Sequence, residues 1–363
     1  MPPPSRHSPR VRRRRRRLLT TLSVASGCVL LLVAVLVGTG SSPGRGGRTV
    51  TTSTATSTTV GTTVVAHGGP YAVGTTSLPF VEPATATLAA RQLPTAVRYP
   101  AQGRAGGTEA PGLAPDRADG PYPLVVFSQG YGIAAEAYAG MLEHWASAGY
   151  VVVDPTYPFT DPSFPGGLNE ADLVNHPADL RYVIASILAL SAARGNVLSG
   201  LVDPNEVAVI GHSDGGDVSL ATAVDPCCQD SLVKAAVILS GAEQAVFGSA
   251  YYAQRSVPLM VVQGTADTIN PPSCSVQLYD AAPAPKYYLS LLGAAHEPPY
   301  LDPGPTQTLV ETTTTDFLNG YLKGRSAALA ALVAAGTIPG QATVSAAASV
   351  GPPVGSCPGA PAG

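Results

Sequence analysis

The chain has little charge and, in particular, very few lysines. Of its 363 residues, 12% are charged, against about 25% in ordinary soluble domains, and only three are lysine. Ten of the 21 basic residues are arginines within residues 1–48, and the first acidic residue is Glu82. Residues 49–363 therefore combine 11 basic with 24 acidic side chains, a net charge of −13. So acidic a body argues against nucleic-acid binding, which needs clustered Lys and Arg against the phosphates.

Glycine and proline are frequent, yet not frequent enough to indicate general disorder. They contribute 39 and 35 residues, about a fifth of the chain, below the roughly 25–30% typical of low-complexity sequences. Hydrophobic residues make up 45% of the chain, and the mean hydropathy is +0.18. With the terminal regions set aside, about 260 residues remain, which is enough for one large α/β domain or two small ones.

The N-terminal region is typical of an export signal. Residues 1–17 are rich in Pro and Arg, and an apolar segment follows over residues 18–40. Positive charge before such a segment holds the N-terminus in the cytoplasm and sends the rest of the chain across the membrane. The ten-residue run 28–37 suits the core of a signal peptide, whereas the apolar segment as a whole is just long enough to span a bilayer as an anchor. We expect an extracytoplasmic protein, either secreted or anchored to the outer face of the plasma membrane.

Three further regions come after the apolar segment. Residues 41–66 form a Thr- and Ser-rich linker that cannot bury a core, and residues 67–325 form a folded domain. Residues 326–363, rich in Ala, Gly and Pro, are expected to form a short helix followed by a loosely ordered tail. Within the domain, short apolar runs alternate with helical patterns. Strands are expected at 124–127, 150–153, 207–210, 235–239, 259–262 and 287–291, and helices at 134–148, 177–193, 213–224 and 306–322. This alternation predicts an α/β fold, a mostly parallel sheet with helices on both faces.

The segment around Ser213 carries the first sign of chemistry. The pattern Gly211-x-Ser213-x-Gly215 follows a predicted buried strand and precedes a predicted helix. In that context it is typical of a sharp strand-to-helix turn, in which only Gly fits two residues on either side of the Ser. Such a turn leaves the Ser hydroxyl exposed above the carboxyl edge of the sheet. We therefore interpret Ser213 as a nucleophile.

A nucleophilic serine needs a histidine to take its proton and a carboxylate to hold that histidine in the right tautomer. Of six histidines, only His296 lies in a loop just after the last predicted strand. The others lie in the N-terminal region, the linker, a helix or its start, or beside Ser213 with the side chain on the opposite face of the strand: His7, His67, His144, His176 and His212. Asp267, in the turn after strand 259–262, completes the order Ser, Asp, His expected of an α/β-hydrolase. Glu243 is the alternative acid.

Ester hydrolysis also needs two backbone N–H groups that face the developing oxyanion. We assign one to Asp214, the residue after the nucleophile. The other is expected in the loop 128–132, whose glycines let the backbone approach the substrate, with Tyr131 as the donor. Several aromatic residues fall on other loops at the carboxyl edge and could line an apolar acyl pocket. Among them the candidate substrate-binding residues are Tyr157, Phe247 and Tyr300.

With these residues in view, the chain resembles a secreted bacterial α/β-hydrolase of the branch that holds dienelactone-hydrolase-like enzymes, platelet-activating-factor acetylhydrolases and polyester-degrading cutinases. The resemblance covers about residues 70–325 and is carried by the segments 93–100, 127–132, 211–216, 263–267 and 315–323. It implies Ser213 as nucleophile, Asp267 as acid and His296 as base, with Tyr131 and Asp214 as backbone donors.

The chain also departs from that branch. In the cutinases a Met commonly follows the serine, whereas here it is Asp214, and their paired aromatic clamp cannot be placed. Only residues 241–258 separate two consecutive strands, too few for a large helical cap, so we expect an open cleft. Four cysteines follow the apolar segment, and disulfides are permitted in an exported body. We expect a bond between Cys274 and Cys357 and leave Cys227 and Cys228 unexplained.

The sequence thus predicts a serine ester hydrolase that forms an acyl-enzyme on an uncharged acyl ester, needs no cofactor or metal, and acts as a monomer. Two alternatives remain: a cell-envelope acyltransferase with the same triad, and a non-catalytic envelope binding protein on this fold. The substrate is expected to be a small-molecule, lipid or polyester ester. Because so negative a domain is repelled by anionic lipid surfaces, neutral or zwitterionic esters are favoured.

Overall fold

The computed structural model describes residues 69–352 and 355–359, all within the unit Thr63–Gly363. The predicted Arg-rich region, apolar segment and linker, residues 1–17, 18–40 and 41–66, lie outside the described residues. Among the helices of the described part, none is long and apolar enough to cross a membrane.

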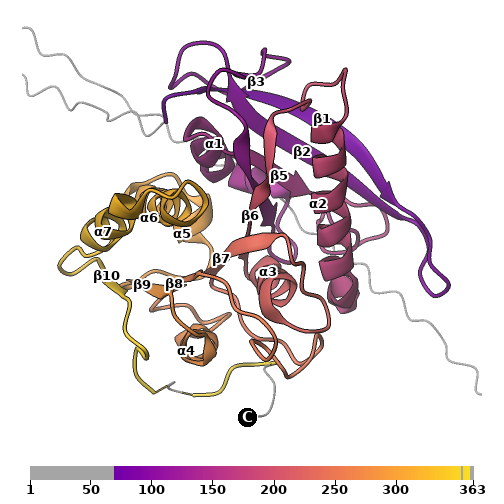
Figure 1. Ribbon diagram of the computed structural model, residues 1–363. Coiled ribbons are helices and arrows are strands. Elements are labelled where there is room, and N and C mark those ends of the chain that lie inside the picture. The colour runs from indigo at the N-terminus through magenta and orange to yellow at the C-terminus, as the bar shows by residue number, and fades with distance from the viewer. Residues whose placement is uncertain (1–68, 353–354, 360–363) are drawn as a thin grey trace, which may run out of the picture. The chain divides into compact units, whose positions relative to one another are not determined.

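The described strands form one ten-stranded sheet, in the order β10-β9-β8-β7-β6-β4-β5-β2-β1-β3 (Figure 1). The six neighbours from β9 to β5 in this order run parallel. An antiparallel hairpin of β1 and β2 extends one edge, where β3 joins β1, and β10 pairs antiparallel with β9 at the other. The strands are β1 (Ala72–Glu82), β2 (Arg91–Ala101), β3 (Ala110–Pro111), β4 (Tyr122–Ser128), β5 (Val151–Pro155), β6 (Val202–His212), β7 (Val233–Leu239), β8 (Leu259–Gly264), β9 (Lys286–Leu291) and β10 (Ala342–Ser345).

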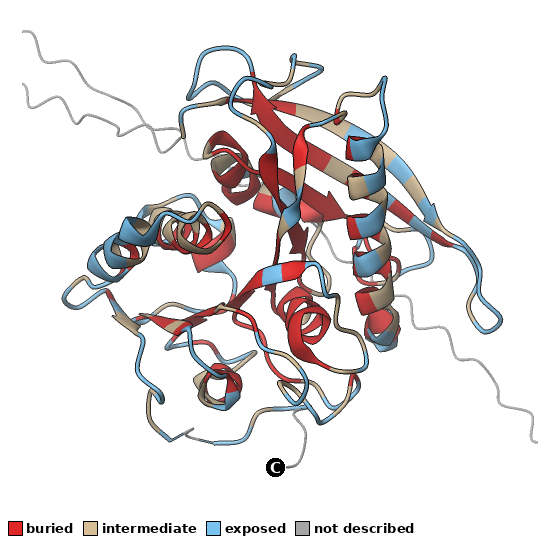
Figure 2. Cartoon of the chain, in the orientation of Figure 1, coloured by how far each residue is buried: buried red, intermediate tan, exposed pale blue. Residues whose placement is uncertain are grey.

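Helices cover both faces of the sheet, so the predicted fold class is confirmed. Buried side chains of α2, α3 and α4 share one core cluster, and those of α1, α5, α6 and α7 share the other. Figure 2 shows the central strands buried between these two layers. The helices are α1 (Ala139–Ser147), α2 (His176–Ala192), α3 (Asp214–Val224), α4 (Pro272–Ala281), α5 (Pro298–Leu301), α6 (Pro305–Leu322) and α7 (Ser326–Ala335), with short 3₁₀ turns η1 (Ala135–Tyr138) and η2 (Glu170–Asn175).

The run Leu124-Val-Val-Phe127 in β4 shows why a continuous apolar stretch forms a central strand. Leu124 and Val126 face the cluster with α2 and α3, while Val125 and Phe127 face the cluster with α1 and α6. All four side chains are fully buried. Because successive side chains of a strand point to opposite faces, a strand covered on both sides needs apolar residues at every position.

Two parts of the C-terminal half of the chain differ from the sequence prediction. Helix α4 lies where no helix was expected, since its ten residues Pro-Ser-Cys-Ser-Val-Gln-Leu-Tyr-Asp-Ala begin at the second residue of a Pro-Pro pair and include few large apolar side chains. The short helix expected at the start of the region 326–363 is present as α7, which packs on α6, but the rest is more than a loose tail, because β10 becomes an edge strand. Its Ala- and Gly-rich composition gives little local signal, and pairing with β9 decides the outcome. Residues 241–258 contain no helix, which agrees with the predicted lack of a large cap.

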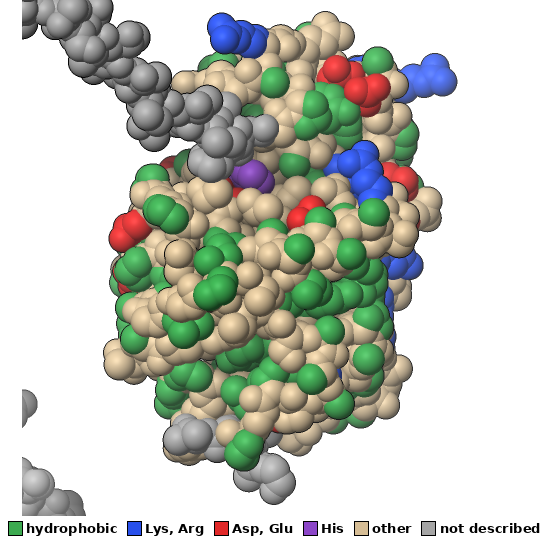
Figure 3. Space-filling model, turned by 90° about the vertical axis from the view of Figure 1, so that its left-hand side faces the viewer, with side chains coloured by type: hydrophobic (Ala, Val, Ile, Leu, Met, Phe, Trp, Pro, Cys, Tyr) green, Lys and Arg blue, Asp and Glu red, His purple; other side chains and the backbone are tan. Residues whose placement is uncertain are grey.

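The scarcity of charge is visible on the surface. On the face shown in Figure 3, hydrophobic side chains are scattered among uncharged groups and charged side chains are few. Some of the charged residues are used inside the fold instead. Arg91 on β2 lies 2.6 Å from both Asp172 and Asp179, and Arg98 on β2 lies 2.9 Å from Asp154 on β5. These buried pairs hold the hairpin against α2 and the parallel strands.

Candidate active site

Ser213 lies in a strained turn between β6 and α3. Its backbone has φ 54° and ψ −127°, a conformation that non-glycine residues rarely adopt and that concentrates at functional sites. A Cβ on Gly211 would collide with the backbone of Gly215, and a Cβ on Gly215 would collide with the backbone of Ser128. The two glycines are therefore required by close backbone approach, as the Gly-x-Ser-x-Gly pattern predicts.

Asp267 and His296 meet at the carboxyl edge of the sheet. Asp267 follows β8 and His296 lies in the loop after β9, and Nδ1 of His296 is 2.7 Å from Oδ2 of Asp267. The backbone N–H groups of Ile269 and Asn270 donate to the other carboxylate oxygen, each at 2.9 Å. Burial raises the pKa of Asp267, but the hydrogen bond and charge of His296 and the bond from Ile269 outweigh it, so that the pKa lies below its ordinary value. This carboxylate is built to stay ionised.

The alternative acid is not at this position. Glu243 is buried after β7, its Oε1 has no hydrogen-bond partner among the described residues, and burial raises its pKa. The structure thus brings Asp267, and not Glu243, into contact with the imidazole.

A cavity of about 510 Å³ opens at Ser213 and His296. Both of the residues assigned to the oxyanion hole, Tyr131 and Asp214, also line it. The remaining lining residues are polar, acidic or small apolar, and none of the lining residues is Lys or Arg: Ile133, Glu170, Gln244, Ile269, Asn270, Glu297, Pro358 and Gly359. Sequence reasoning missed all of this second group.

The loop that follows β4 runs beside the nucleophile, since a Cβ added to Gly130 would lie 3.2 Å from the Cβ of Ser213. On one side, the N–H of Gly130 donates to the hydroxyl of Tyr138 at 3.1 Å. On the other, the N–H of Gly132 donates to the carbonyl of Thr160 at 2.8 Å. Asp214 is the first residue of α3, where backbone N–H groups have no partner within the helix. The donor assigned at Asp214 therefore belongs to a segment suited to bind an anion, and the bonds of its two neighbours hold Tyr131 in its loop.

Asp214 also brings a carboxyl group to the cavity. Burial and the nearby charge of Glu170 raise the pKa of Asp214 to about 6, although His296 opposes the shift. Its Oδ2 is buried without a hydrogen-bond partner among the described residues. The cavity therefore gains negative charge as the pH rises through about 6.

The aromatic residues assigned to substrate binding do not line this cavity, which corrects the sequence prediction. Tyr157 and Tyr300 are almost fully buried and bond through their hydroxyls to Ser128 and Ser240, each at 2.9 Å. Phe247 is buried in the core cluster beside α3. All three do lie near the carboxyl edge, but their rings fold inward beneath it, because large aromatic surfaces gain most from burial. Loop position alone does not reveal that direction.

The chain's C-terminal residues supply one wall of the cavity. We call Ser356–Gly359 the C-terminal strap, because a disulfide between Cys274 and Cys357 fastens it to α4. The N–H of Ala245 donates to the carbonyl of Gly359 at 2.8 Å, and Pro358 and Gly359 face the cavity. A second disulfide joins the neighbours Cys227 and Cys228 just after α3. The expected bond between Cys274 and Cys357 was the signal in the sequence from which the position of the C-terminal strap could have been inferred.

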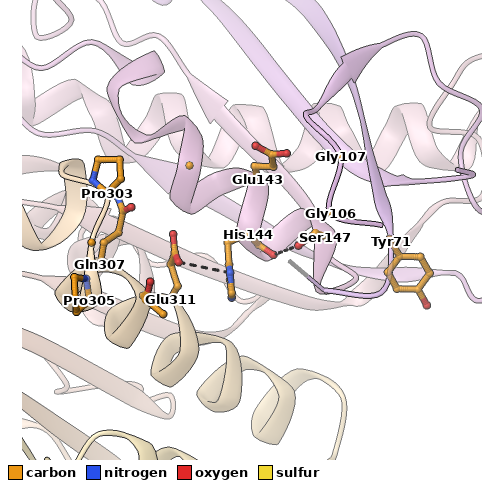
Figure 4. A pocket seen from close by; sticks show the side chains of 13 residues that line it. Tyr71, Gly106, Gly107, Glu143, His144, Ser147, Pro303, Pro305, Gln307 and Glu311 are labelled. Carbon is orange, nitrogen blue, oxygen red and sulfur yellow. Dashed lines mark hydrogen bonds and ion pairs between the residues drawn. The ribbon is translucent and has the colours of Figure 1, made fainter. Parts of the chain in front are cut away.

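A larger cavity, of about 690 Å³, lies between α1 and α6 (Figure 4). His144 from α1 faces Glu311 from α6 across it, with Nδ1 and Oε2 3.7 Å apart. Burial raises the pKa of Glu311 to about 7. In the described part of the chain, no group of three or more His, Cys, Asp or Glu side chains is arranged to hold a metal ion.

The parallel sheet, the two helical layers and the turn at Ser213 define an α/β-hydrolase fold. A family model described as chlorophyllase matches residues 113–254, from just before β4 to the loop after β7, and so includes Ser213 but neither Asp267 nor His296. The match supports an α/β-hydrolase family and, for activity, an ester hydrolase acting on carboxylic esters. No curated protein matches the chain.

Proposed function

We propose that the chain is an exported serine hydrolase that cleaves uncharged or zwitterionic carboxylic esters through an acyl-enzyme. The observation that carries the proposal is one cavity lined by both a strained Ser213 and a His296 that bonds to Asp267. These three residue types in this order are the parts of a serine hydrolase triad.

The hydrogen bond between Asp267 and His296 determines which nitrogen of His296 takes the proton in the first step. Because the carboxylate of Asp267 accepts, Nδ1 of His296 carries the hydrogen and Nε2 keeps its lone pair. Nε2 takes the proton of the Ser213 hydroxyl as its oxygen attacks the ester carbonyl. His296 then gives that proton to the departing alcohol, which leaves the acyl group on Ser213.

The second half-reaction repeats these steps with water. His296 removes a proton from a water molecule, the resulting nucleophile attacks the acyl carbonyl, and Ser213 recovers its proton as the acid departs. In both halves the negative oxygen is held by the N–H groups of Tyr131 and Asp214, a stabilisation worth about 3–4 kcal/mol for each donor.

The charge of the cavity supports the substrate class. Glu170, Asp214 and Glu297 line it together with His296, without Lys or Arg among the lining residues. An anionic acyl or alcohol group would meet these carboxylates at close range and with little compensation. Neutral esters, or zwitterionic ones that present a cationic group, avoid this repulsion. Export is part of the same proposal and rests on residues 1–40 of the sequence.

The test is hydrolysis of p-nitrophenyl esters by the purified chain, with Ser213→Ala as its partner. We expect the wild type to turn over short neutral esters and to be labelled by a fluorophosphonate probe, and the variant to do neither. Unchanged turnover in Ser213→Ala would refute the assignment. A product that forms only when an alcohol acceptor is added would indicate acyl transfer, and lack of both turnover and labelling would indicate a binding protein.

A further inference from the structure

His212, the residue before the nucleophile, is fully buried and makes two hydrogen bonds in opposite directions. Its Nδ1 lies 2.8 Å from the hydroxyl of Tyr138, and its Nε2 lies 3.1 Å from the backbone carbonyl of His296. The same Tyr138 hydroxyl accepts the backbone N–H of Gly130 at 3.1 Å. A continuous chain of hydrogen bonds therefore joins the loop after β4 to the loop after β9 through the end of β6.

The hydrogens in this series of hydrogen bonds can be placed in one way only. A backbone carbonyl only accepts, so Nε2 of His212 carries the hydrogen and donates to His296. Nδ1 of the neutral ring then accepts, and the hydroxyl of Tyr138 donates to it while its oxygen accepts from Gly130. Burial, followed by the proximity of His296, lowers the pKa of His212 to about 3, so the ring stays neutral and keeps this tautomer throughout the physiological range.

Both ends of this series of hydrogen bonds lie one residue or less from a group that the proposed reaction uses. Gly130 precedes Tyr131, whose N–H is assigned to the oxyanion hole. The carbonyl at the other end belongs to His296 itself, and the rings of His212 and His296 pack with centroids 4.7 Å apart. His212, which lies between them, is the last residue of the central strand β6, and the following residue is Ser213.

We propose that His212 is a positioning residue that fixes the oxyanion loop and the base loop to the same rigid strand end that presents the nucleophile. It touches neither the substrate nor the Ser213 hydroxyl in this role, and Tyr138 acts as its extension toward Gly130. The inference rests on the proposed function. Its physical basis is that displacement of a catalytic group by about 1 Å can lower the rate roughly 100-fold.

Two conservative substitutions of His212 separate the two bonds. In His212→Asn, the amide oxygen occupies the place of Nδ1 and still accepts from Tyr138, but the side chain is too short to reach the carbonyl of His296. In His212→Gln, the amide nitrogen occupies the place of Nε2 and still donates to that carbonyl, but Tyr138 loses its acceptor. Tyr138→Phe removes only a hydroxyl and releases the oxyanion loop.

We expect Tyr138→Phe and His212→Gln each to lower kcat roughly 10- to 100-fold, with KM changed less than about threefold, because both loosen the oxyanion loop. Their double variant should be no slower than either single one, since it breaks the same link. His212→Asn should lower kcat through the base loop, and its combination with Tyr138→Phe should multiply the two losses. The rates are measured on the full chain with p-nitrophenyl butyrate and divided by the number of sites that a fluorophosphonate probe labels.

Tyr150→Phe is the matched control. It also removes a buried tyrosine hydroxyl, whose bond to Asn319 is 3.0 Å long, but it lies away from both loops. We expect it to lower the thermal midpoint about as much as Tyr138→Phe while kcat per labelled site stays at the wild-type value. If Tyr138→Phe and His212→Gln match this control in kcat, the inference is wrong. If Ser213→Ala retains turnover, the proposed function is wrong and the inference falls with it.

Discussion

Two cavities in the described part of the chain each hold a histidine opposite a carboxylate, and the larger one has no nucleophile in a strained turn. Around Ser213, His296 Nδ1 lies 2.7 Å from Asp267 in a cavity of about 510 Å³. Between α1 and α6, His144 Nδ1 lies 3.7 Å from Glu311 in a cavity of about 690 Å³. The first distance is that of a strong hydrogen bond, whereas the second is too long for one. Size is therefore a poor guide to the chemistry of this molecule.

The carboxyl groups of Asp267 and Glu311 differ in how readily they ionise, because their surroundings differ. Asp267 accepts two backbone N–H bonds besides that of His296, and these favour its charged form. Burial raises the pKa of Glu311 to about 7, so this carboxyl remains largely protonated below that pH. A neutral acid cannot stabilise an imidazolium in the way that an ionised one does. The comparison teaches that the surroundings of the carboxyl decide whether a His-carboxyl pair can serve a nucleophile.

The largest expected effect comes from exchanging the two carboxyl groups for amides, one at a time. Asp267→Asn should lower kcat for ester hydrolysis roughly 10³- to 10⁴-fold, because the amide donates to Nδ1 and selects the wrong tautomer of His296. Glu311→Gln, the matched change in the larger cavity, should leave kcat unchanged. Steady-state rates on p-nitrophenyl butyrate check both. Equal losses in the two variants would abolish the distinction between the cavities.

A second, smaller effect concerns the charge of the smaller cavity. The carboxyl of Asp214 ionises with a pKa raised to about 6, so discrimination against an anionic ester should grow as the pH rises from 5 to 7. Asp214→Asn keeps the backbone donor and removes the charge. It should raise the rate on an anionic relative to a neutral ester roughly tenfold at pH 7.5 and much less at pH 5. The ratio of kcat/KM values at the two pH values is the measurement, and a pH-independent ratio in the wild type would contradict it.

A third effect concerns the wall of the smaller cavity. Cys357→Ser frees the C-terminal strap, so long acyl chains should gain access and their kcat/KM relative to acetate should rise about threefold. Reduction of the wild type should reproduce the change. The double variant Cys227→Ser/Cys228→Ser loses the remote disulfide instead and should keep the wild-type ratio. A shift of the same size in that control would assign the effect to general loosening.

The smallest effect is on stability and belongs to the larger cavity. The folded chain holds the proton of Glu311 up to a pKa of about 7, whereas the ordinary value is 4.5, so stability is lost as the pH rises between these values. Glu311→Gln removes that loss. It should raise the thermal midpoint by about 2–4 °C at pH 8 and leave it nearly unchanged at pH 4. Thermal unfolding at the two pH values tests this, and an equal shift at both would contradict the assigned cause.

The elements that could be predicted from the sequence are those with strong local patterns. The run 124–127 is apolar at every position because both faces are covered, and the glycines around Ser213 mark a turn that no other residue fits. Asp267 and His296 follow from chain order, since parallel strands end at the same edge. The inward rotation of Tyr157 could not be read in this way, because it depends on packing against distant residues.

The parts that could not be predicted lie in the last third of the chain. Helix α4 is short and begins at a Pro-Pro pair, and β10 exists because β9 offers an unpaired edge. The C-terminal strap is held by one disulfide, by a backbone bond from Ala245 and by a bond from the hydroxyl of Ser273, none of which leaves a periodic pattern. Composition describes such a segment as a loose tail, while its place in the fold is decided by contacts with residues about 80 positions away, such as Cys274, 83 residues from Cys357.

The bond between Cys274 and Cys357 makes one wall of the cavity at Ser213 depend on the redox state of two thiols. Thiols stay reduced in the cytosol but pair in oxidising compartments. A chain with both thiols reduced would hold Ser213, Asp267 and His296 in place beside an unfastened wall. If the chain is exported as proposed, oxidation of this pair fixes that wall, and with it the range of acyl chains that the cavity admits.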